Sequence, residues 1–126
     1  MNNDGKSTVL IIEDDIAVRR ALHSLFGCGT GFDACVDTGS GADAMTEAKQ
    51  RSPGLAILGF PVVQTNGLLL VRDLKALAPN LPIFMLTPDY NFDTEKEALS
   101  FGVTAVFGKP DDLATLVENA RAVCDA

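Results

Sequence analysis

Two adjacent acidic residues, Glu13 and Asp14, follow the first apolar run of the chain, residues 9–12. Neighbouring carboxylates repel each other, so such a pair usually needs a cation. A hard ion such as Mg²⁺, held by one or two carboxylates together with water and phosphate oxygens, would suit this pair. Helix capping explains the pair equally well, because Asp14 or Asp15 could accept hydrogen bonds from the first turn of a following helix. For Asp15 we expect capping alone.

Three more residues of interest end later apolar runs. Thr87 follows residues 83–86, and Lys109 stands between a glycine and a proline after residues 103–107. Taken alone, these two are best explained as a strand-end hydroxyl and a solvated loop lysine. Gly59 ends the run at residues 55–58 and contributes no side chain. In a parallel sheet ligands bind at the carboxyl ends of the strands, so the spacing of these residues across βα units favours a common site.

Apolar runs alternate with helical patterns along the whole chain. The helices are expected to begin after residues 15, 40, 67, 94 and 110, with capping boxes at Ser40 and Thr94 and a stop at Gly102. Strands are expected at residues 8–12, 32–36, 55–58, 82–86 and 103–107. This alternation predicts an α/β fold with three layers: a doubly wound, five-stranded parallel sheet of order 2-1-3-4-5 with helices on both faces. Residues 1–126 are predicted to form one domain, with residues 1–6 as a flexible tail.

The composition excludes several classes of partner. The chain has 126 residues and a net charge of -7, without a cluster of Lys and Arg, so we expect this domain to bind neither nucleic acid nor anionic membrane. No apolar run approaches the roughly 20 residues that span a bilayer, and the polar N-terminus lacks a signal core. We therefore expect a cytoplasmic protein. The three cysteines fit neither a disulfide framework nor a zinc site.

Taken together and in this order, the motifs resemble the receiver domain of two-component response regulators, over essentially the whole chain. The matching segments are residues 9–15, 40–45, 66–68, 82–87 and 108–110. The resemblance implies a flavodoxin-like fold. It also implies that Glu13 and Asp14 hold magnesium, that Thr87 bonds the phosphoryl group, and that Lys109 pairs with acceptor and phosphoryl oxygens.

The chain departs from the family pattern at the centre of this pocket. The family's phosphoacceptor is an aspartate eight residues before the glycine of the loop after strand three, and counting back from Gly67 gives Gly59. Pro88 replaces the usual small residue after the threonine. Val106 occupies the place of the aromatic switch residue, and a β-branched valine has no ring to turn. The resemblance therefore implies a degenerate phosphorylation pocket: Glu13, Asp14, Gly59, Thr87 and Lys109.

Aspartyl phosphorylation needs a carboxylate nucleophile, which Gly59 cannot supply. We therefore expect a pseudo-receiver that is not an enzyme, needs no cofactor, and binds Mg²⁺ weakly if at all through Glu13 and Asp14. It would act through protein contacts on the face of the fourth helix, fifth strand and fifth helix, with a homodimer as one form. Two alternatives stay open: a ligand-gated receiver that binds a small molecule in the vacated pocket, and a conventional phosphorylated regulator carrying a substitution at Gly59.

Overall fold

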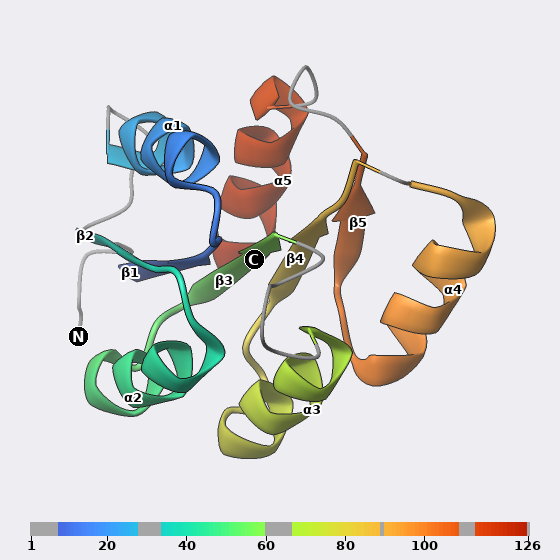
Figure 1. Cartoon of the computed structure of the whole chain (residues 1–126), viewed down its shortest axis with the longest axis horizontal. Coiled ribbons are helices and arrows are strands. Elements are labelled where there is room, and N and C mark those ends of the chain that lie inside the picture. The colour runs from blue at the N-terminus through green and yellow to red at the C-terminus, as the bar shows by residue number, and fades with distance from the viewer. Residues whose placement is uncertain (1–7, 28–33, 60–66, 89, 109–112, 126) are drawn as a thin grey trace.

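The computed structural model describes residues 8–27, 34–59, 67–88, 90–108 and 113–125. In this part of the chain, strands and helices alternate without exception (Figure 1). The strands are β1 (Thr8–Ile12), β2 (Ala34–Thr38), β3 (Leu55–Gly59), β4 (Ile83–Leu86) and β5 (Ala105–Phe107). The helices are α1 (Ile16–Gly27), α2 (Gly41–Arg51), α3 (Gly67–Leu77), α4 (Phe92–Phe101) and α5 (Leu113–Asp125). The predicted tail at residues 1–6 and Lys109 lie outside the described residues.

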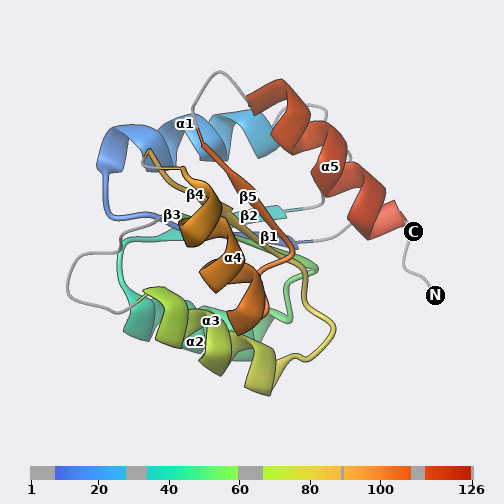
Figure 2. The ribbon, with the colours of Figure 1, turned by 90° about the vertical axis from the view of Figure 1, so that its right-hand side faces the viewer.

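The described strands form one parallel sheet in the order β2-β1-β3-β4-β5, which confirms the predicted fold class and strand order. Helices cover both faces of this sheet, with α1 and α5 on one side and α2, α3 and α4 on the other (Figure 2). Parallel strands joined by right-handed helical crossovers produce this three-layer arrangement.

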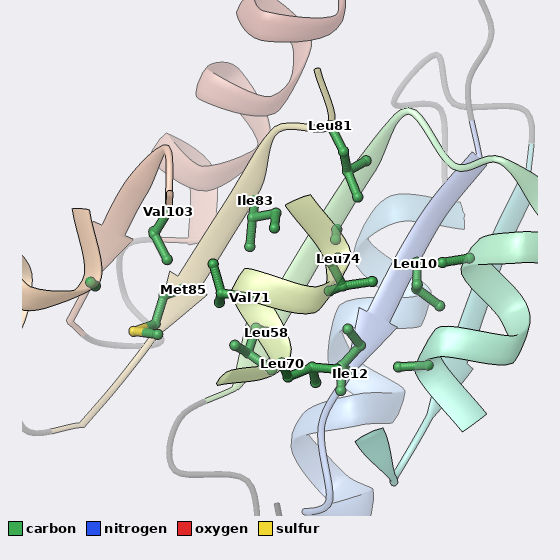
Figure 3. Packing of buried hydrophobic residues seen from close by; sticks show 14 residues of the cluster. Leu10, Ile12, Leu58, Leu70, Val71, Leu74, Leu81, Ile83, Met85 and Val103 are labelled. Carbon is green, nitrogen blue, oxygen red and sulfur yellow. The ribbon is translucent and has the colours of Figure 1, made fainter. Parts of the chain in front are cut away.

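The core lies in two layers because successive side chains of a strand point to opposite faces. In β1, Leu10 and Ile12 pack toward α2 and α3, whereas Val9 and Ile11 pack toward α1 and α5. Figure 3 shows the first of these layers. Because both faces are covered, the described central strands are apolar almost throughout, and all of β3 is buried. Packing on both faces holds the sheet in place, and with it the carboxyl ends of the strands.

Side chains define where two of the helices begin. The Ser40 hydroxyl accepts a hydrogen bond of 3.1 Å from the Asp43 N–H, which confirms the predicted cap of α2. The predicted start of α4 at Thr94 is wrong. The helix begins at Phe92, because the side chain of Asn91 accepts a 2.8 Å hydrogen bond from the Thr94 N–H and so caps the first turn. The predicted stop at Gly102 is confirmed, since this residue adopts φ 112° at the end of α4.

These caps give a direct prediction for α4. We expect Asn91→Ala to reduce the free energy of unfolding by about 1 kcal/mol, because one N–H of the first turn loses its acceptor. Thr94→Ala is the matched control. Thr94 contributes its backbone N–H to the cap, and alanine retains that group. Urea unfolding followed by circular dichroism measures both variants, and an equal loss in the two would contradict this assignment of the cap.

Candidate functional site

The register of the sheet brings three of the predicted site residues to one edge. Ile12 pairs with Leu58. Glu13 follows Ile12 and Gly59 follows Leu58, so these two residues lie at the ends of neighbouring strands. Gly59 in turn pairs with Leu86, which places Thr87 directly beyond it at the end of β4. Two backbone hydrogen bonds of 2.9 Å hold this edge, from the Glu13 N–H to the Thr38 carbonyl and from the Thr87 N–H to the Phe107 carbonyl. Lys109 comes two residues after β5 and is outside the described residues.

The carboxyl group of Glu13 lies against the backbone of Gly59. A Cβ atom built on Gly59 would overlap Oε1 of Glu13 and would stand 2.6 Å from its Cδ and 3.2 Å from its Oε2. These are the three nearest atoms to such a Cβ, apart from those of the glycine and its chain neighbours. The space that a side chain at residue 59 would enter is therefore taken by Glu13, and both residues are buried.

Burial controls the ionisation of Glu13. Loss of solvent raises the pKa of its carboxyl above the ordinary value of 4.5, against the effect of a 2.9 Å hydrogen bond that Oε2 accepts from the Asp15 N–H. A hydrogen bond with the side chain of Asp14 raises this pKa further, as do the negative charges of Asp14 and Asp15. Glu13 therefore holds a proton more readily than an exposed glutamate does.

This raised pKa predicts how stability depends on pH. The folded state binds the Glu13 proton more tightly than the unfolded state, so the resulting stabilisation is complete below about pH 4.5 and is lost as pH rises through the raised pKa. A Glu13→Gln variant keeps the shape without the charge. We expect the two proteins to have similar free energies of unfolding at pH 4. As pH rises toward 7, the variant should become more stable than the wild type. Urea melts across this range test the prediction, and a constant difference would refute it.

The acidic residues that follow β1 are not arranged as a magnesium site would require. The Asp15 side chain accepts hydrogen bonds of 2.9 Å from the Ala17 N–H and 3.2 Å from the Val18 N–H, so it caps α1 as predicted. Within the described residues, no group of three or more His, Cys, Asp or Glu side chains is placed to hold a metal ion. Gly59 adds no ligand, and the Glu13 carboxyl lies in the space beside it. The side chains in this arrangement do not fit the magnesium site that the fold family implies.

Sequence reasoning missed one participant, Arg19. This residue of α1 is half-buried, and its Nη1 donates a 3.1 Å hydrogen bond to the Glu13 carbonyl. The same nitrogen lies so close to Gly39 that a Cβ there would overlap it. Arg19 thus links α1 to the end of β1 and to the turn after β2. Val18, the residue before it in α1, is 37% exposed.

The two residues at the predicted switch positions are buried or half-buried. Thr87 is only 3% exposed, and Val106 is half-buried against the core layer that includes Met85 and Val103. Phe107 packs on Phe84 with ring centroids 5.3 Å apart.

Helix α4 carries apolar side chains that are exposed to solvent. Phe92 is 73% exposed and Leu99 is 47% exposed, and the preceding Tyr90 is 46% exposed.

Comparison with known proteins shows the family of this chain. Residues 9–121 match the family described as response regulator receiver domain. The chain is 32% identical over 117 residues to the DNA-binding transcriptional activator DevR/DosR of Mycobacterium tuberculosis, covering 93% of this chain and 52% of that protein. It spans about half or less of the length of the curated relatives it matches.

Solved structures show the same fold. A two-component response regulator of the LuxR family from Aurantimonas sp. SI85-9A1 superposes with a TM-score of 0.86 at 16% identity, covering 95% of this chain and 86% of that one. A response regulator receiver domain protein from Methanospirillum hungatei JF-1 gives a TM-score of 0.84 at 18% identity, with 95% and 94% covered. Among the described residues, no helix combines the length and apolarity needed to cross a membrane.

Proposed function

Because this chain belongs to the response regulator receiver domain family, we propose that it is a pseudo-receiver, a two-component signalling module that is not phosphorylated at the usual site. One observation carries the proposal. The residue at the end of β3, beside the Glu13–Asp14 pair, is a glycine, and the Glu13 carboxyl fills the space where its side chain would be. Phosphoryl transfer to a receiver requires a carboxylate nucleophile at that point, and glycine has none.

Other groups in the pocket are poor substitutes for the missing nucleophile. The Thr87 hydroxyl is nearly inaccessible to a phosphoryl donor, because Thr87 is 3% exposed. The carboxyl of Glu13 is also a poor acceptor, because Glu13 is buried and a phosphoryl donor has little access to it. The module is therefore not an enzyme, needs no cofactor, and binds Mg²⁺ weakly at most.

The output of such a module is a protein contact that does not depend on phosphorylation. Val106 offers no aromatic ring that could turn, and Pro88 biases Thr87 toward extended geometry. Exposed Phe92 and Leu99 on α4 support a protein partner on the face formed by α4, β5 and α5, because exposed apolar side chains of this kind supply contact area in interfaces. A homodimer through this face is the second form of the same proposal.

The names of the relatives bear on the cellular location of this module and on nucleic-acid binding. The similar curated proteins are named as transcriptional regulators, which supports a cytoplasmic module within a regulatory pathway. DNA binding is stated in the name of DevR/DosR, of which this chain covers 52%. The net charge of -7 argues against nucleic-acid binding by the receiver domain itself. The ligand-gated alternative has less support, because Glu13 already occupies the space beside Gly59.

Exposure to a small phosphoryl donor tests the proposal. The wild-type protein is incubated with acetyl phosphate and Mg²⁺, and its intact mass is measured before hydrolysis can proceed. A phosphorylatable receiver of the same family serves as the positive control. We expect no gain in the mass of the wild type, and a stoichiometric phosphoryl adduct would overturn the proposal.

A further inference from the structure

We propose that Glu13 is the internal occupant of the pocket that Gly59 leaves open, so that its carboxyl closes the site to a cation. This inference rests on the proposed function and names the group that regulates access to the same site. It makes Glu13 a positioning residue, whose location depends on the absence of a side chain at residue 59.

The contacts around Gly59 support this role. Gly59 is the last residue of a regular, fully buried strand and does not adopt a positive φ, so its backbone would accept an ordinary side chain. The obstacle to a Cβ there comes from Glu13, which supplies its three nearest neighbours. All three are atoms of the carboxyl group, the far end of a flexible side chain. A side chain at residue 59 and the present position of Glu13 therefore exclude each other.

The position of Glu13 has a consequence for cations. A divalent cation is bound more tightly as the number of carboxylate ligands rises. Glu13 now uses Oε2 to accept the Asp15 N–H, while Oε1 lies in the space beside Gly59. The Glu13 carboxyl also hydrogen-bonds the side chain of Asp14, so the two acids bind each other beside Gly59. A Glu13 carboxyl displaced from this space would leave room for a cation that both acids could share. Filling the space at residue 59 should therefore increase cation binding even when the new side chain cannot itself be a ligand.

A methyl group at residue 59 tests this inference. We expect Gly59→Ala to bind Mn²⁺ about tenfold more tightly than the wild type by calorimetric titration, although alanine supplies no ligand atom. The gain should vanish in Gly59→Ala/Glu13→Gln, where the displaced side chain carries no charge. Glu13→Gln alone should bind Mn²⁺ as weakly as the wild type. Equal affinity of Gly59→Ala and the wild type would overturn the inference.

Melting curves of Gly59→Ala and of a further variant, Gly59→Ala/Glu13→Ala, cover the case in which the methyl group prevents folding. If Gly59→Ala is unfolded but Gly59→Ala/Glu13→Ala is folded, Glu13 is the obstacle and the inference stands. If both are unfolded, the obstacle lies elsewhere and the inference fails. Neither result depends on phosphorylation, so failure here is distinct from a phosphoryl adduct on the wild type, which would overturn the proposed function.

Discussion

Gly59→Asp is expected to gain a phosphoryl group from acetyl phosphate in the presence of Mg²⁺, whereas the wild type gains none. The variant places a third carboxyl at the end of β3, beside Glu13 and Asp14. The group that must move is the flexible end of Glu13, so the new side chain can enter and Glu13 can join Asp14 as a cation ligand. Three anionic groups attract a divalent cation far more strongly than the present pair.

The chemistry of this gain is a simple substitution. An oxygen of the new carboxylate attacks the phosphorus of acetyl phosphate, the bond to the acetyl oxygen breaks, and acetate leaves with the electron pair. Gly59→Asn is the matched control, since it has nearly the same shape without a nucleophilic carboxylate. Intact mass spectrometry measures the mass of all three proteins after treatment with acetyl phosphate. An unmodified Gly59→Asp protein would mean that the pocket has lost more than its nucleophile.

The largest effect on stability is expected at Phe84. Its ring is fully buried in the layer between the sheet and helices α1 and α5, and it packs on Phe107. We expect Phe84→Ala to lower the free energy of unfolding by about 3–5 kcal/mol, from lost apolar burial together with the cavity that remains. Proteins of this size are stable by only about 5–15 kcal/mol, so this one change removes a large share of the total.

Phe92→Ala provides the matched control for Phe84→Ala, because it deletes the same ring from a position that is 73% exposed. We expect it to change the free energy of unfolding by less than about 0.5 kcal/mol. Equilibrium unfolding in urea measures both variants. A loss at Phe84 of less than about 1 kcal/mol, or equal losses at the two positions, would contradict the described core.

The sequence was a good guide to the fold because β1, β3, β4 and β5 are apolar runs, and strands alternate with helical patterns along the chain. Both faces of the sheet are covered, so β1 and β3 are continuously apolar and easily recognised. The helix caps were a weaker guide. Ser40 was predicted correctly. Thr94 was predicted as a cap because a capping-box pattern starts there, whereas the cap in the structure is Asn91, three residues earlier.

The sequence predicted which residues meet at the candidate site, but it did not predict the contacts that their side chains make there. The βα alternation alone brings Glu13, Gly59 and Thr87 to one edge. The direction of the Glu13 side chain depends on its rotamer and on the absence of a side chain at residue 59. Local sequence patterns do not predict this direction. The contact of Arg19 with the Glu13 carbonyl likewise crosses from a helix to a strand end, where helical periodicity carries no information.

The central claim is that the wild-type pocket takes up neither a phosphoryl group nor its mimic. The most direct measurement is a titration of the ¹⁵N-labelled wild-type protein with beryllofluoride and Mg²⁺, followed through the amide resonances of Glu13, Gly59 and Thr87. We predict that these resonances stay in place, because Glu13 fills the space beside Gly59 and no acceptor carboxylate is present there. Saturable shifts of these three amides would contradict the claim.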